Sequence, residues 1–229
     1  MLQQELDHET GILTLRLARA PVNALNQTMY DALHEGLAFA AHNHDVKTIV
    51  LSAQGSKAFC AGADIKEFAH LSREMAEHKQ LALLLRCLQD LVSCPKPTVA
   101  AVSAPAIGAG LMLACACDEI VMVDTAWVSL PEIELSLPTP IGAAIVGRRL
   151  RLPAVHALLQ RAERFEAARC LTEGLVDVVT PIDQFDALAG ARVSVYTAFN
   201  TEVYATNKRW LNRGLSEQLK AAADMVSHT

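Results

Sequence analysis

Two loops of very small residues carry the strongest chemical signal in the sequence. One is Cys60-Ala61-Gly62-Ala63-Asp64, and the other is Gly108-Ala109-Gly110. Because these residues have almost no side chains, a ligand can approach their backbone N–H groups closely. If one amide from each loop faces the same point, the pair forms an oxyanion hole, in which fixed donors stabilise negative charge on a carbonyl oxygen. The same composition fits simple close packing of a helix on a strand equally well.

Helix N-termini are predicted directly after both loops. Asp64 and Glu67 have the spacing of a capping box, which predicts that a helix begins immediately after the first loop. The apolar run from Leu111 predicts a helix after the second loop. Each helix would direct free N–H groups and the positive end of its dipole toward a bound anion.

Other chemistries lack their motifs. Leu113 stands where a dinucleotide-binding loop that begins at Gly108 needs its third glycine. There is no P-loop, no nucleophile elbow and no His-Glu-x-x-His zinc motif. Cys115 and Cys117 form the only close cysteine pair, and no further ligands accompany them. We therefore expect no metal site, and we interpret the 6 cysteines as small buried hydrophobic residues.

Composition narrows the class of protein further. The 229 residues are 52% hydrophobic and 20% charged, with a net charge of -5, which fits one large domain, or one plus a small appendage, and disfavours nucleic-acid binding. A basic groove for a phosphorylated small molecule stays open. The acidic start and the lack of an uninterrupted apolar run of about 18 residues predict neither a signal peptide nor a membrane span. We expect a cytoplasmic protein.

Strands and helices alternate along the chain and must position the two loops. Short β-branched runs predict buried strands, whereas helical spacing of apolar residues predicts helices. The predicted strands are residues 13–17, 47–52, 98–102, 119–123 and 176–180, and the predicted helices are residues 28–41, 75–92, 154–161 and 165–173. Gly174 is the expected C-cap of the last of these helices. Beyond Asn207 the chain again becomes helical and charged, and the whole pattern indicates an α/β protein.

Several motifs, in the expected order, resemble the enoyl-CoA hydratase/isomerase (crotonase) superfamily. They are Arg19–Asn26, Lys57–Glu67, Pro97–Val102 leading into Gly108–Gly110, Cys117-Asp118 and Leu171–Val176. The resemblance covers the chain from Leu13 to Asn207.

The resemblance implies a fold and a class of ligand. We expect an α/β spiral of repeated strand-strand-helix turns over residues 1–190, followed by a short C-terminal helical segment over residues 191–229, where relatives are longer. The family binds acyl-CoA thioesters, usually as trimers or dimers of trimers. A homo-oligomer is therefore expected, with coenzyme A present as part of the substrate and no separate cofactor.

The resemblance also implies roles for individual residues. The amides of Ala63 and Ala109 would form the oxyanion hole, with Ala109 in place of the usual glycine. The other residues expected to contact the substrate or its coenzyme A part are Ala20, Pro21, Val22, Ala61, Asp64, Ile65, Lys66, Gly108 and Met112.

The family's hydratases use two glutamates, but this sequence retains one. Met112 stands at the first position and cannot transfer a proton, whereas Glu132 stands at the second. Water addition needs two proton-transferring groups, but one base suffices to shift a double bond. The sequence therefore predicts an enoyl-CoA isomerase in which Glu132 has a raised pKa in an apolar setting, beside Met112 as an apolar wall. Glu134 is the spare candidate and would share the face of Glu132 only in an extended segment.

Two alternatives stay open. The first is a weak enoyl-CoA hydratase, or another reaction through a thioester enolate such as decarboxylation. The second is a non-catalytic acyl-CoA binding subunit. The acyl chain is not predicted, because Ala69–Arg86, which should line its pocket, shows no recognisable pattern.

Overall fold

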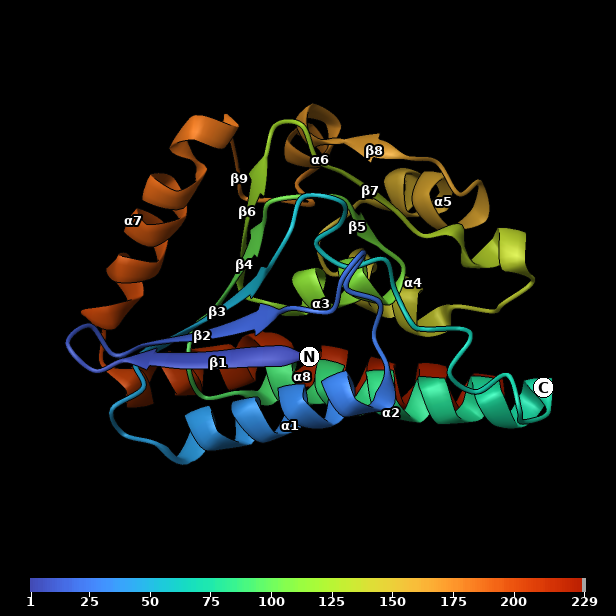
Figure 1. Ribbon diagram of the computed structural model, residues 1–229, viewed down its shortest axis with the longest axis horizontal. Coiled ribbons are helices and arrows are strands. Elements are labelled where there is room, and N and C mark those ends of the chain that lie inside the picture. The colour runs from blue at the N-terminus through green and yellow to red at the C-terminus, as the bar shows by residue number, and fades with distance from the viewer. Residues whose placement is uncertain (228–229) are drawn as a thin grey trace.

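A six-stranded sheet runs through the centre of the computed structural model, which describes residues 1–227 (Figure 1). Strand β1 is antiparallel to β2, and all later neighbours are parallel. The predicted strands are confirmed to within two residues, and β4 and β6 are buried at every position. In spatial order the strands are β1 (Leu2–Asp7), β2 (Ile12–Leu17), β3 (Thr48–Ala53), β4 (Thr98–Val102), β6 (Glu119–Val123) and β9 (Val178–Thr180).

A second, three-stranded sheet stands beside the first. It consists of β5 (Ala106–Ile107), β7 (Trp127–Ser129) and β8 (Phe165–Glu166). The prediction that a helix begins at Phe165 is wrong, because this residue pairs with Val128 and its ring is fully buried. Helix α6 (Ala167–Glu173) follows, and Gly174 is confirmed as its left-handed C-cap, with φ of 81°.

Long helices cover one face of the large sheet (Figure 1). They are α1 (Gln27–His42), α2 (Arg73–Ser93) and α8 (Thr201–Ser227), while α7 (Phe185–Thr197) lies apart from them against β3 and β6. In α1 the buried side chains Met29, Leu33 and Leu37 recur with helical spacing, and Asn26 caps the first turn by accepting from the Met29 amide.

The strands and helices follow one another as the expected spiral. One turn consists of β4, β5 and α3 (Ala109–Ala116), and the next begins with β6 and β7 and continues to α4 (Pro140–Gly147) and α5 (Leu152–Gln160). None of the helices within residues 1–227 is long and apolar enough to span a membrane.

Helix α8 packs on α2 and α4, and its Leu215 and Leu219 belong to the same apolar core as the strands. Residue 190 lies within α7, and the division into residues 1–190 and 191–229 stays a prediction. Residues 228 and 229 of the predicted C-terminal segment lie outside the described residues.

A buried ion pair attaches α8 to the sheet. The ammonium of Lys208 lies 2.7 Å from a carboxylate oxygen of Asp118, and the two side chains are 4% and 11% exposed. The same ammonium donates to the carbonyl oxygen of Lys96 at 3.1 Å. Asp118 therefore has a structural role.

Breaking this pair should destabilise the fold. Lys208→Met leaves the Asp118 carboxylate buried without its cation, and we expect the free energy of unfolding to fall by about 3–5 kcal/mol. Urea unfolding followed by circular dichroism measures this change. Lys220→Met, which alters an exposed lysine of the same helix, is the matched control. Equal stability of the two variants would show that the pair contributes nothing.

Candidate active site

A cavity of about 630 Å³ lies at the carboxyl ends of the central parallel strands. The loops that follow β2, β3 and β4 line it, together with the N-terminal half of α2 and the segment after β7. Every residue that the sequence singled out for the site lies on its wall. These are Ala20, Pro21, Val22, Ala61, Ala63, Asp64, Ile65, Lys66, Gly108, Ala109, Met112 and Glu132.

The two small-residue loops lie directly against each other. The Ile107 amide donates to the Cys60 carbonyl oxygen at 2.9 Å. A Cβ on Gly62 would stand 3.6 Å from the Ala109 nitrogen, and one on Gly110 would stand 2.4 Å from the Cys60 carbonyl oxygen. Close packing, the simpler explanation of the small residues, is therefore present, and it brings the two backbones to one wall of the cavity.

The amides of Ala63 and Ala109 are both available to a ligand. Ala109 is the first residue of α3, where an N–H group has no partner within the helix. Within residues 1–227 neither amide donates a hydrogen bond. Both residues line the same cavity, so the arrangement provides two free donors and the positive end of the α3 dipole.

The predicted capping box at Asp64 is wrong. The carboxylate of Glu67 instead accepts from the Gln27 amide at 2.8 Å, at the start of α1, and the Asp64 amide donates to the Leu25 carbonyl oxygen at 2.8 Å. A series of turns follows the loop, and the next helix, α2, begins only at Arg73. The helix N-terminus that was expected after the first loop is therefore absent, whereas the second loop has one.

Glu132 projects into the cavity from a short 3-10 helix, Pro131–Leu135, that follows β7. Its carboxylate lies against Gly108, because a Cβ on that glycine would be 2.8 Å from Oε1. Its second oxygen, Oε2, is buried and has no hydrogen-bond partner within residues 1–227. Burial raises the pKa of Glu132 above its ordinary value, as predicted, although a backbone hydrogen bond partly opposes the shift.

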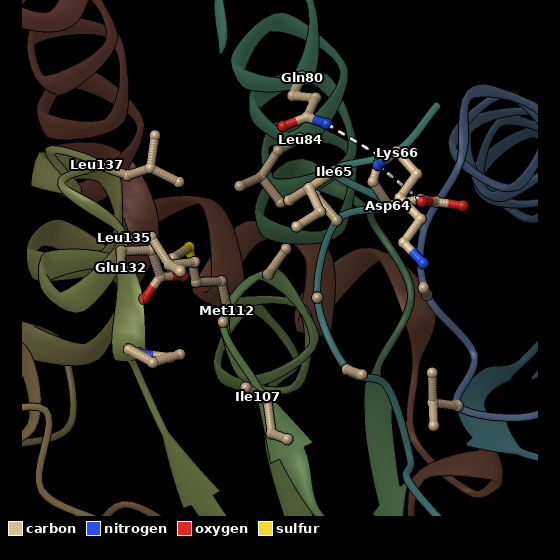
Figure 2. A pocket seen from close by; sticks show the side chains of 18 of the residues that line it. Asp64, Ile65, Lys66, Gln80, Leu84, Ile107, Met112, Glu132, Leu135 and Leu137 are labelled. Atoms are coloured by element: carbon tan, nitrogen blue, oxygen red, sulfur yellow. Dashed lines mark hydrogen bonds between the residues drawn. The ribbon is translucent and has the colours of Figure 1, made fainter. Parts of the chain in front are cut away.

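Met112 and Glu134 occupy opposite kinds of environment. The Met112 side chain is 2% exposed and lies beside Glu132 in the cavity wall (Figure 2). Its methyl carbon packs on α4, where a Cβ on Gly142 would be 3.1 Å away. Glu134, in contrast, is exposed, because the 3-10 turn directs it away from the cavity. Of the two glutamates of this 3-10 turn, Glu132 is therefore the one that faces the cavity.

Several cavity residues were not named individually from the sequence, although part of the stretch Ala69–Arg86 lines the cavity as expected. One face of α2 contributes Gln80 and Leu84, and the segment after Glu132 contributes Leu135 and Leu137, which lie across the cavity from Leu84 (Figure 2). Gln80 also donates to the Asp64 carbonyl oxygen at 3.1 Å. The cavity residues of α2, from Glu77 to Leu84, recur every three or four positions, which is the spacing of one helix face. This spacing is the sequence signal that could have identified them.

An ion pair holds the opposite rim of the cavity. Arg19, also missed from the sequence, lies 2.6 Å from a carboxylate oxygen of Asp64. Burial alone would raise the pKa of Asp64, but hydrogen bonds from Arg19 and from the Lys66 amide hold it below its ordinary value. Asp64 therefore stays ionised and orients the loop that carries the exposed Lys66 side chain.

Among the side chains that the structure describes, no group of three or more His, Cys, Asp or Glu is placed to hold a metal ion.

Comparison with known proteins identifies the family. The enoyl-CoA hydratase/isomerase family model matches residues 7–228. A probable enoyl-CoA hydratase of Mycobacterium bovis is 31% identical over 216 residues, which cover 94% of this chain and 82% of that protein. Carboxymethylproline synthase of Pectobacterium carotovorum subsp. carotovorum is 25% identical over 224 residues, covering 98% and 89%. A solved enoyl-CoA hydratase of Mycobacterium smegmatis has a TM-score of 0.87 at 31% identity, covering 99% and 89%. The chain therefore has the crotonase fold and belongs to the enoyl-CoA hydratase/isomerase family.

Proposed function

We propose that this protein is an enoyl-CoA isomerase, which moves the double bond of a 3-enoyl-CoA thioester into conjugation with the carbonyl group. The observation that supports it is the buried carboxylate of Glu132 against Gly108, in the same cavity wall as two free backbone amides, with Met112 at the other position from which a proton could be transferred. One group that both removes and returns a proton is enough for this reaction.

The two amides stabilise the intermediate. The thioester oxygen accepts from the N–H groups of Ala63 and Ala109, which lie on one wall of the cavity. Negative charge that develops on this oxygen in the dienolate is stabilised by donors that need no rearrangement. Removal of one such donor typically costs about 3 kcal/mol in the activation barrier.

Glu132 transfers the proton. Its carboxylate lies against Gly108, one residue before the Ala109 donor, so a thioester whose oxygen is held by the Ala109 amide would bring its C2 atom close to this carboxylate. It takes a proton from C2, the double bond shifts from C3–C4 to C2–C3 through the dienolate, and the same proton returns at C4. The raised pKa of Glu132 favours its action as an acid in the second step.

The rest of the cavity binds the remainder of the substrate. Leu84, Leu135 and Leu137 provide an apolar pocket for the acyl chain, and the rim around Arg19 and Lys66 receives the coenzyme A part. The residues from Ala20 to Val22, and those from Ala61 to Ile65, line the path between them. A homo-oligomer, a trimer or hexamer, and a cytoplasmic location remain predictions.

Incubation with trans-3-hexenoyl-CoA tests the proposal. We expect the conjugated 2-enoyl thioester to form, which its ultraviolet absorbance reports. The names of the hydratase relatives favour water addition instead, so crotonyl-CoA is assayed in parallel. Hydration of crotonyl-CoA as fast as isomerisation would contradict the argument from Met112, and binding of both esters without any conversion would indicate a non-catalytic acyl-CoA binding protein.

The pH profile provides an independent measurement. Glu132 must be ionised to accept a proton, so kcat/KM should fall as the pH decreases through its pKa. Because burial raises this pKa, the midpoint should lie above the ordinary value for glutamate, about 4.3. Circular dichroism at each pH shows whether the fold persists. A midpoint at or below the ordinary value, with the protein folded, would contradict the assignment of Glu132 as the base.

A further inference from the structure

A second cavity, of about 430 Å³, lies at the amino ends of strands β3 and β4, on the side of the sheet away from the active site. Its walls come from the residues before β3 and β4, the end of α1 and the turn between α7 and α8. Figure 1 shows this turn toward the left, away from α3 and α4. The strands that separate it from the active site are five or six residues long, which corresponds to ~17–20 Å. The residues that matter here are His44, Lys47, Lys96, Phe199, Asn200 and Glu202.

The sheet register places two lysines side by side in this cavity. Ile49 of β3 pairs with Thr98 of β4, and Lys47 and Lys96 each stand two residues before these partners. The Lys47 amide donates to the Gly11 carbonyl oxygen at 2.7 Å. Pro95 and Pro97 restrict the backbone on both sides of Lys96. Both lysine backbones are therefore held in place.

Lys96 is a largely buried residue whose ammonium has no partner in the described part of the chain but is not itself enclosed. The residue is 5% exposed, and its ammonium makes no ion pair or hydrogen bond within residues 1–227. Burial lowers the pKa of Lys96, and the neighbouring Lys47 lowers it further. Lys208, the other buried lysine nearby, is compensated by Asp118. The Lys96 ammonium therefore faces the cavity, where an anion would pair with it.

The remaining polar groups of the cavity are accounted for. The side-chain oxygen of Asn200 accepts from the amides of Glu202 and Val203, so these amides of the first turn of α8 are not free to bind an anion. The positive end of the α8 dipole still faces the cavity. Glu202 is the one carboxylate among the cavity residues and makes no ion pair within residues 1–227. His44 is exposed at the rim. The two lysines therefore supply the attraction for an anion, and the carboxylate of Glu202 opposes it.

We propose that this cavity binds the phosphate group of a small metabolite, held by the ammonium groups of Lys96 and Lys47. The cavity exceeds the size of inorganic phosphate, and Phe199, with 51% of its surface exposed, provides an apolar wall for the rest of the molecule. This site is separate from the one for the coenzyme A thioester, because it opens at the amino ends of the strands and the active site opens at their carboxyl ends.

Isothermal titration of the full chain with inorganic phosphate, at constant ionic strength, tests the proposal. We expect binding to the wild type, and affinity lower by at least about tenfold in Lys96→Met and in Lys47→Met, since each removes a hydrogen bond to a charged group. The matched control is Lys220→Met, an exposed lysine of α8 whose loss should leave the affinity unchanged.

Stability provides a second readout. Without phosphate, Lys96→Met should melt at about the same temperature as the wild type, because the Lys96 ammonium makes no ion pair or hydrogen bond within residues 1–227 that the substitution would remove. With phosphate, only the wild type and Lys220→Met should gain stability. No binding to the wild type, or equal binding by all four proteins, would overturn the proposal.

Ribose 5-phosphate and AMP distinguish the possible sources of the phosphate. If AMP binds more tightly than ribose 5-phosphate, and Phe199→Leu makes the two affinities equal, the metabolite is a nucleotide whose base stacks on the Phe199 ring. Equal affinities that still depend on Lys96 indicate a sugar phosphate. In both cases the proposal is supported if Lys96→Met weakens binding. It is refuted if Lys96→Met binds both ligands as tightly as the wild type.

Discussion

Glu132→Gln is expected to lower kcat for isomerisation of trans-3-hexenoyl-CoA by about 10²- to 10⁴-fold, with little change in KM. Glutamine keeps the shape of the side chain beside Gly108 but cannot accept a proton. Steady-state rates measure the effect, and Glu134→Gln, an exposed carboxylate of the same 3-10 turn, is the matched control with unchanged rates expected. Equal kcat in wild type and Glu132→Gln would refute the proposed mechanism.

The stability of Glu132→Gln separates lost chemistry from lost folding. The pKa of Glu132 is raised in the folded state, so its ionised form reduces stability at pH values above that pKa, and this cost disappears as the pH falls below it. Glutamine removes the cost. At pH 7 the variant should therefore melt at the same temperature as the wild type or higher, and a lower melting temperature would mean that the loss of rate has a structural cause.

Much of the fold could be predicted because local signals agree with the tertiary structure. Strands β4 and β6 are buried on both faces, and such strands are continuous apolar runs that are easily recognised. The loop before α3 was identified for the same kind of reason. Gly108 has φ of 53° and Gly110 lies against the Cys60 carbonyl oxygen, so small residues are required there whatever binds.

The parts that failed depend on partners distant in sequence. Glu67 has the spacing of a capping residue for Asp64, but its carboxylate caps α1, 40 residues earlier in the chain. Phe165 fits a helical pattern, yet pairing with Val128 makes it part of a strand. Leu84 and Leu137 line the acyl pocket only because α2 and the segment after β7 face each other. Spacing along the chain carries no information about such contacts.

Met112→Glu should introduce the second carboxylate that hydration requires. Met112 is buried beside Glu132 in the cavity wall, so a carboxylate at position 112 would lie close to the one already present (Figure 2). Two close carboxylates cannot both ionise readily, so the pair would hold one proton near neutral pH. This provides one base to activate water and one acid to protonate the α-carbon.

We expect Met112→Glu to hydrate crotonyl-CoA at least about 10²-fold faster than the wild type, since one positioned proton-transfer group typically contributes that much. The matched control is Met112→Gln, which has nearly the same shape and polarity but no ionisable group. Melting temperatures of both variants show that each is folded, since a buried polar group at this site has a cost in stability. If the two folded variants hydrate crotonyl-CoA equally slowly, the missing glutamate is not what separates this protein from a hydratase, and the choice of isomerisation loses its chemical basis.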